Sequence, residues 1–181
     1  MMIKAAILVD ENNLVSQLKM MGIQGLHPWG SIREVMKELL EREYGPTEVV
    51  CHFYGAAAPL NKNINEHYNR KRFFQALRKD NIIVHEGRCI SNNSKWEEKG
   101  IDVMIGLDVV ELSRTQNIIF LFSGDSDLAP AVERVKRPCK VVSVISNQLS
   151  SRWIKKVSDS VLPLEALMAI IDKSHIRYID K

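Results

Sequence analysis

The sequence has little cysteine and no long hydrophobic run, and both absences narrow the class of protein. The three cysteines, Cys51, Cys89 and Cys139, are scattered through 181 residues, and no metal-ligand spacing links them. We therefore expect a reduced cytoplasmic setting and no framework of disulfide bonds. No apolar stretch approaches the roughly 20 residues of a membrane helix, so no membrane partner is expected. The apolar start before Asp10 is too short for a signal peptide and predicts a strand.

The chain also lacks a large excess of charge of either sign. Its formal net charge is only +3, which neither requires nor excludes binding to nucleic acid. The charges are unevenly placed along the chain. Eight acids lie in residues 97–133, and seven bases without an acid follow in 134–156. A further basic stretch spans 69–79. Any single run is best explained as a solvated helix face, whereas basic flanks around an acidic centre favour a polyanion held over a cation.

Short apolar runs alternate with amphipathic stretches along the chain. Strand–helix alternation implies parallel pairing, and continuously apolar strands are covered on both faces. We therefore expect an α/β fold, a three-layer sandwich with a mainly parallel central sheet. One domain of residues 1–163 is expected, with the helix and tail of 164–181 belonging to it. The predicted strands are 3–9, 48–54, 82–85 with an extension towards 90, 118–122 and 141–145, and the predicted helices are 14–21, 31–44, 64–79, 100–113, 128–137, 150–157 and 164–171.

Four aspartates are predicted to lie at one edge of this sheet. Asp10 ends the first strand, and Asp125 and Asp127 follow the fourth. Asp102 lies in the first turn of a helix that starts where the third strand ends. Converging carboxylates raise one another's pKa unless a cation neutralises them, and oxygen ligands suit Mg²⁺ or Mn²⁺. The pattern thus favours a site for one or two such ions.

Each aspartate also has a structural explanation. Asp127 can cap a helix, Asp102 can stabilise a helix N-terminus by its charge, and Asp10 can be a turn residue. Their joint placement at one edge, rather than any single residue, is what favours the metal site.

Asp108 is not expected to bind the same ion as Asp102. It lies six residues further along, or about 9 Å in a helix, whereas Mg²⁺ ligands lie about 2.1 Å from the ion. Its position on an apolar stripe requires a polar partner, and we expect a structural acid that orients the loop at Ser123. The five histidines, including His67 and His85, show no partner spacing and are not expected to form a ligand set.

Three segments resemble the NYN domain family, in its LabA-like branch of the PIN-like nucleases. Residues 6–14 resemble the family's strand that ends in Asp, with Asn three residues later. Residues 99–108 are similar to its Lys-Gly-x-Asp helix start, and residues 123–128 to its Ser-Gly-Asp-x-Asp-Phe signature, with Leu128 in place of Phe. The resemblance extends over about residues 3–162. It implies a PIN-like fold, a divalent metal and RNA as the usual substrate class.

These observations lead to the hypothesis of a metal-dependent ribonuclease that hydrolyses phosphodiester bonds in single-stranded RNA. Basic side chains would hold the RNA backbone by charge, and Trp96 is the favoured residue for stacking on bases. The predicted metal ligands are Asp10, Asp102, Asp125 and Asp127, the predicted catalytic residues are Asp10, Asp102, Asp125 and Asn13, and the predicted substrate-binding residues are Asn13, Ser123, Arg70, Arg72, Lys140 and Arg152.

Two alternatives follow from the same residues. A haloacid-dehalogenase-type phosphatase needs an acid two residues after its nucleophile, and Asn12 occupies that position. A non-catalytic metal- and RNA-binding module of the same fold would have identical ligands. The amphipathic segments 31–44 and 164–171 can pack within the fold, which is the default, or against a second copy in a homodimer.

Overall fold

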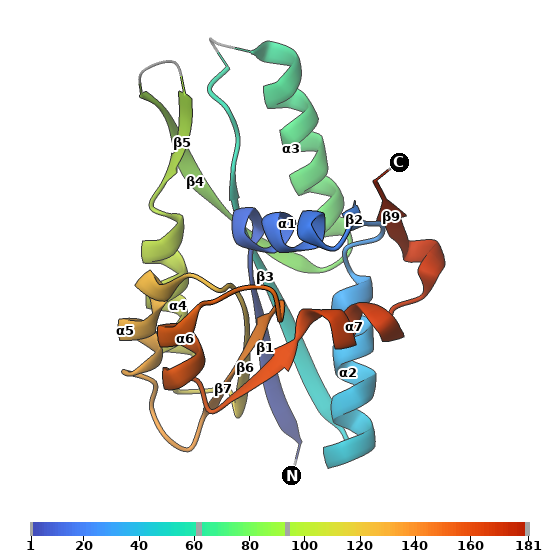
Figure 1. Cartoon of the computed structure of the whole chain (residues 1–181), viewed down its shortest axis with the longest axis vertical. Coiled ribbons are helices and arrows are strands. Elements are labelled where there is room, and N and C mark those ends of the chain that lie inside the picture. The colour runs from blue at the N-terminus through green and yellow to red at the C-terminus, as the bar shows by residue number, and fades with distance from the viewer. Residues whose placement is uncertain (1, 61–62, 93–94, 180–181) are drawn as a thin grey trace.

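A seven-stranded sheet forms the centre of the computed structural model, which describes residues 2–60, 63–92 and 95–179 (Figure 1). The strand order is β5-β4-β3-β1-β6-β7-β8. All neighbouring strands are parallel except β4 and β5, which form an antiparallel pair. The strands are β1 (Ile3–Asp10), β3 (Thr47–Ala56), β4 (Ile82–Asn92), β5 (Lys95–Lys99), β6 (Ile118–Phe122), β7 (Lys140–Ile145) and β8 (Ser160–Pro163).

Helices cover both faces of this sheet. Consecutive residues of β1 point to opposite faces, as the two-residue period of a strand requires. Ile7 packs into one hydrophobic core beneath α1, α2, α3 and α7, and Leu8 packs into the other beneath α4, α5 and α6. The predicted three-layer α/β fold is thereby confirmed. The helices are α1 (Glu11–Met20), α2 (Ser31–Tyr44), α3 (Ile64–Lys79), α4 (Ile101–Leu112), α5 (Ala129–Val132), α6 (Arg152–Val157) and α7 (Leu164–Ile170).

The order of the strands creates a switch point beside β1. From β1 the chain continues through β3 and β4 on one side, and it then returns to β6, β7 and β8 on the other. The crevice between β1 and β6 at the carboxyl ends of the strands is where such sheets bind ligands. We call this edge the carboxyl edge. Helix α1 crosses it, and α3 and the β4–β5 hairpin extend beyond it (Figure 1).

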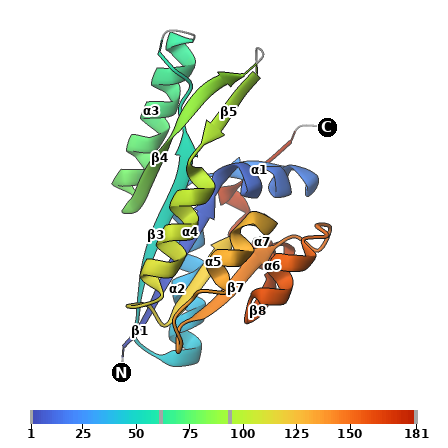
Figure 2. The ribbon, with the colours of Figure 1, turned by 90° about the vertical axis from the view of Figure 1, so that its left-hand side faces the viewer.

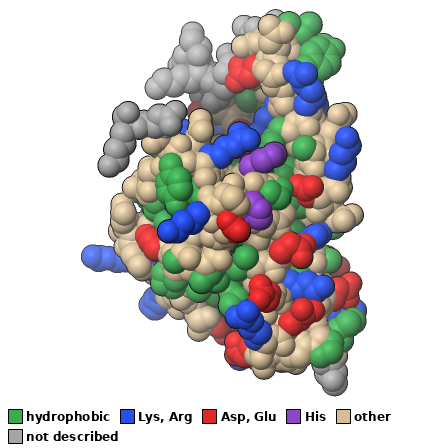
Figure 3. All heavy atoms as spheres, turned by 90° about the vertical axis from the view of Figure 1, so that its right-hand side faces the viewer, with side chains coloured by type: hydrophobic (Ala, Val, Ile, Leu, Met, Phe, Trp, Pro, Cys, Tyr) green, Lys and Arg blue, Asp and Glu red, His purple; other side chains and the backbone are tan. Residues whose placement is uncertain are grey.

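Helices α2 and α7 pack within the same core, as their amphipathic patterns predict. Met36 of α2 and Leu167 of α7 both belong to the core that contains Ile7. The outer face of α2 pairs Lys37 with Glu41 at 3.7 Å. Figure 3 shows this side of the molecule with acidic and basic side chains interspersed, which gives it no field of a single sign.

Several short elements differ from the sequence-based expectation. Strand β2 (Ile23–Leu26) pairs with β9 (Ile176–Tyr178) in a separate two-stranded sheet. Strands this short carry no readable periodicity, and β2 lies among turn residues. The helix expected over 128–137 is a 3₁₀ turn at Ser126–Leu128 followed by α5. Among the described residues, none of the helices could span a lipid bilayer.

Leu8 offers a direct test of the core beneath α4. Its side chain is 0% exposed, whereas that of Leu107 on the outer face of α4 is 66% exposed. We expect Leu8→Ala to lower the free energy of unfolding by about 2–5 kcal/mol through lost burial and a cavity. The matched control Leu107→Ala should stay within about 0.5 kcal/mol. Urea unfolding followed by circular dichroism measures both, and equal effects would contradict the assignment.

Candidate metal centre

Asp10 lies at the carboxyl end of β1, next to the end of β6, and is the N-cap of α1. Its Oδ1 accepts a hydrogen bond of 3.2 Å from the Asn13 backbone N–H, and its Oδ2 accepts one of 2.8 Å from the Ser123 hydroxyl. Only 5% of the residue is exposed. Because both oxygens are held by neighbours from two different segments, the carboxylate is fixed at the switch point of the sheet.

The loop after β6 is fastened to α1 by a short chain of hydrogen bonds. The Gly124 N–H donates to Asn13 Oδ1 at 2.8 Å, and the Asp125 N–H donates to Ser123 Oγ at 3.1 Å. A Cβ atom at Gly124 would lie 2.4 Å from Cδ2 of Leu149, so the Leu149 side chain would have to move to admit it. These contacts position Asp125 beside Asp10.

The aspartates line a pocket of about 340 Å³ at the carboxyl edge. We call it the acidic pocket. Five of its residues were not predicted as site residues, and the acid run over 97–133 was the available signal for two of them. Asp127 is exposed and does not belong to the lining. The lining residues are Asp10, Asn12, Asn13, Glu97, Glu98, Lys99, Ile101, Asp102 and Asp125.

The carboxylates of this pocket influence one another's protonation. Burial above all, together with the charges of Asp102 and Asp125, raises the pKa of Asp10 from 3.8 to about 6, against the hydrogen bonds from Ser123 and Asn13. Burial followed by the charges of Asp125 and Asp127 raises the pKa of Asp102. The structure thus brings aspartates from three separate segments into one electrostatic environment.

This donor set fits a hard divalent cation. All ligating atoms are oxygens, Asp10 is destabilised as an anion, and Lys99 is the one basic residue among the lining. The carboxylates of the acidic pocket are more widely spaced than the ligands of a closed metal site. Among the described residues, the group of three whose ligating atoms all lie within 4.8 Å of one another is elsewhere in the fold. Mg²⁺ keeps several waters and uses one or two carboxylates, which suits an open pocket.

The predicted substrate-binding bases do not all lie near the acidic pocket. Lys140 pairs with Ile118 at the amino ends of β7 and β6, so it lies at the opposite edge of the sheet. The two ends of a strand lie a whole strand length apart, and β7 begins at Lys140 and ends before Arg152. The closeness of these two residues in the sequence gave no sign of this separation. Arg152 is exposed and follows Ser151, whose hydroxyl donates to the Gly124 carbonyl at 2.6 Å. Arg152 is therefore beside the carboxyl edge.

Arg70 and Arg72 come from the same helix but differ in their contacts. The Arg70 guanidinium pairs with Glu11, donates to the Ala56 carbonyl at 3.0 Å and lies 4.5 Å from the ring centre of Phe74. Its donors therefore serve the protein itself. Arg72 is exposed and contacts Asn69. The side chain of Trp96, predicted to stack on bases, lies outside the described residues.

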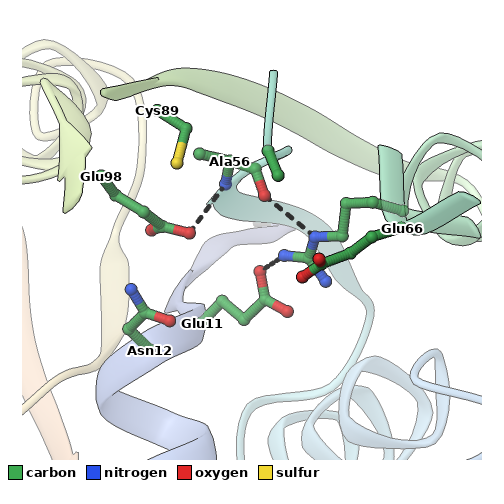
Figure 4. Close-up of a pocket in the computed structure, with 8 residues that line it drawn as sticks. Glu11, Asn12, Ala56, Glu66, Cys89 and Glu98 are labelled. Atoms are coloured by element: carbon green, nitrogen blue, oxygen red, sulfur yellow. Dashed lines mark hydrogen bonds and ion pairs between the residues drawn. The ribbon is translucent and has the colours of Figure 1, made fainter. Parts of the chain in front are cut away.

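A second pocket of about 390 Å³ adjoins the acidic pocket and shares Asn12 and Glu98 with it (Figure 4). Arg70 and Glu11 form an ion pair in the lining of this pocket. Figure 4 shows Glu11 on one side and Glu98, which accepts a hydrogen bond from the Ala56 N–H, on another. Gly55 makes space for the pair, since a Cβ atom there would lie 2.1 Å from Glu11 Oε2. Sequence reasoning did not identify this pocket.

The histidines show no partner spacing along the sequence, but the fold brings two of them together. His52 and His85 lie with Asp108 in a group whose ligating atoms are within 4.8 Å of one another. The spacing of 33 residues between the histidines gives no local pattern, and only the pairing of β3 with β4 joins them. Asp108 has the polar partner that its place on an apolar stripe requires, but this partner is the Tyr54 hydroxyl, which donates to it at 2.8 Å, and not the Ser123 loop.

The fold and the acidic edge define a class of α/β proteins with carboxylates at the switch point of a parallel sheet. The family model of the NYN domain matches residues 4–165, and the chain belongs to this family. Its fold is similar to that of the crystal structure of a protein of unknown function from Vibrio parahaemolyticus, with 22% identity, 96% coverage of both chains and a TM-score of 0.64. No curated protein matches the chain.

Titration of Asp10 by carbon NMR tests the electrostatics of the acidic pocket. In the metal-free protein we expect a pKa of about 6. Asp125→Asn removes a neighbouring negative charge and should lower this pKa, whereas Ser123→Ala removes a hydrogen bond to the ionised form and should raise it. A pKa near 3.8 in the unmodified protein would contradict the geometry.

The same shift has a consequence for stability. The pKa of Asp10 is higher in the folded state than the value of 3.8 expected for the unfolded chain. The folded state therefore binds more protons, and the contribution of Asp10 to stability falls as the pH rises from 3.8 to about 6.

Proposed function

We propose that this protein is a ribonuclease that requires a divalent cation, Mg²⁺ or Mn²⁺. The observation that carries the proposal is the convergence of Asp10, Asp102 and Asp125 around one pocket at the switch point of the sheet. Membership of the NYN family supports it, because that family suggests the PIN-like nuclease superfamily.

The residues of the acidic pocket have different roles in this proposal. Asp10, Asp102 and Asp125 would hold the cation, with Asp127 close enough to add to their negative field. A divalent cation bound there neutralises phosphate charge and makes a water molecule more acidic. Ser123 keeps the Asp10 carboxylate oriented through its hydroxyl. Asn13 uses its oxygen to hold Gly124 and Gln17, which leaves its amide N–H groups to hydrogen-bond a phosphate oxygen.

Single-stranded RNA is the proposed substrate. The acidic pocket repels a polyanion unless a cation is bound, so substrate binding depends on the cation. Exposed bases beside the carboxyl edge, Arg152 above all, would contact the backbone and make binding sensitive to salt. Lys140 and Arg70 are not part of this proposal, because the first lies at the opposite edge and the second is paired with Glu11. The three cysteines are free, which supports a cytoplasmic setting.

A cleavage assay with end-labelled single-stranded RNA tests this function. We expect cleavage with Mg²⁺ or Mn²⁺ and none after chelation with EDTA. Asp10→Asn should reduce the rate at saturating RNA by at least about 100-fold, a loss comparable to removing one group that stabilises a transition state. The rate is compared at equal concentrations of folded protein, as judged by circular dichroism.

Asp80→Asn is the matched control. Asp80 follows the last residue of α3 and lines a different pocket, together with Gly30 and Arg33. This variant should cleave at the rate of the unmodified protein. If the unmodified protein binds RNA in a cation-dependent way but does not cleave it, the non-catalytic binding module replaces the nuclease. Equal rates for Asp10→Asn and the parent would refute the mechanism.

A further inference from the structure

A second set of candidate metal ligands lies between the sheet and the middle of α4, away from the acidic pocket at the first turn of that helix. It consists of His52 on β3, His85 on β4 and Asp108 on α4, and we call it the histidine cluster. Figure 2 shows α4 running along this face of the sheet. Since Asp108 lies six residues beyond Asp102, or about 9 Å along the helix, the cluster is separate from the acidic pocket.

The spacing within the histidine cluster suits a tetrahedral ion. Nδ1 of His52 lies 2.9 Å from Nε2 of His85, and the latter lies 3.7 Å from Oδ2 of Asp108. Ligands about 2.0–2.1 Å from a tetrahedral Zn²⁺ are about 3.3 Å from one another. The two observed distances lie on either side of that value, and all three ligating atoms lie within 4.8 Å of one another. Binding of one ion by all three would replace the hydrogen bond between the two imidazoles and require their rings to turn.

Burial keeps the imidazoles in the form that binds metals. The pKa of His52 is lowered to about 4 by burial and by the neighbouring His85, and burial lowers the pKa of His85. Both rings are therefore neutral at physiological pH, as metal ligation requires. Two nitrogens and one carboxylate oxygen form a softer donor set than the all-oxygen acidic pocket, and imidazole suits Zn²⁺ rather than Mg²⁺.

Tyr54 holds two members of the cluster in place. Its hydroxyl donates to Asp108 Oδ2 at 2.8 Å, and its ring stacks on that of His85 with centres 4.5 Å apart. Hydrogen bonds of this kind orient the ligands of protein metal sites and raise their affinity. The side chains of His85 and Asp108 are 25% and 30% exposed, so an ion and a water molecule can reach the cluster from one side.

We propose that His52, His85 and Asp108 bind a Zn²⁺-class transition-metal ion, with an open fourth position for water. Catalytic zinc sites have three protein ligands and one exchangeable position, whereas structural zinc sites have four protein ligands. The site is independent of the cation in the acidic pocket and does not rest on the proposed nuclease activity.

Calorimetric titration of the chelator-treated, dialysed full chain with ZnCl₂ tests the proposal. Excess MgCl₂ is present throughout so that the oxygen ligands of the acidic pocket are occupied. We expect one Zn²⁺ to bind per chain. His85→Ala should weaken binding by more than about 100-fold, because losing a ligand exceeds the 10–100-fold typical of losing its hydrogen-bond partner. Tyr54→Phe keeps the stacked ring but loses the hydroxyl and should weaken binding by about 10–100-fold.

Three control variants separate this site from other ligands. His67→Ala removes a half-buried imidazole elsewhere, Cys89→Ser removes the half-buried thiol, and Asp125→Asn alters the acidic pocket. All three should retain full Zn²⁺ binding. Asp125→Asn should lose RNA cleavage while His85→Ala retains it, so the two proposals fail separately.

A spectroscopic measurement covers the case in which a variant unfolds. Cobalt(II) substituted for Zn²⁺ in the unmodified protein should give the visible absorption of a tetrahedral nitrogen and oxygen site. Tyr54→Phe should retain this spectrum at higher cobalt concentration. Absence of Zn²⁺ binding by the unmodified chain, an octahedral cobalt spectrum, or equal affinity of His85→Ala and the parent would overturn the proposal.

Discussion

The contact between Asp10 and Ser123 is the interaction on which the site depends. It joins the end of β1 to the loop after β6 across the switch point, with a hydrogen bond of 2.8 Å between buried groups. Without it the carboxylate would have to remain buried with one partner fewer, and the Ser123 loop would lose its link to the first strand. The same contact brings Asp125 towards Asp10, because the Asp125 N–H bonds to the same hydroxyl. A negatively charged pocket therefore forms as a consequence of how two strands end.

Helix α4 connects the two proposed cation sites. Its first turn carries Asp102 to the carboxyl edge, and its middle carries Asp108 over β3 and β4. The two donor sets differ in chemistry, since one contains only oxygens and the other contains two imidazoles. Ions that differ in softness would therefore distribute between them by ligand type. A single helix thus contributes one carboxylate to each of the two proposed sites.

The sequence was sufficient for the features that depend on order along the chain. Asp10, Asp102 and Asp125 were assigned to one edge because each follows or precedes an element whose direction in a parallel sheet is known. Lys140 and His85 show where this reasoning stops. Lys140 was grouped with Arg152 by sequence proximity, although a strand separates them, and His85 meets His52 only through the register of β3 and β4. Short strands such as β2 were missed because four residues carry no period.

Position 124 carries a consequence for how this chain can vary. A side chain at Gly124 would collide with Leu149, and its Cβ would also lie 2.7 Å from Ser151 Oγ. The loop that presents Asp125 and the segment that leads into α6 are thus fitted to each other. Homologues that keep this loop are expected either to retain glycine or to replace residues 124, 149 and 151 together, so these positions should covary across the family.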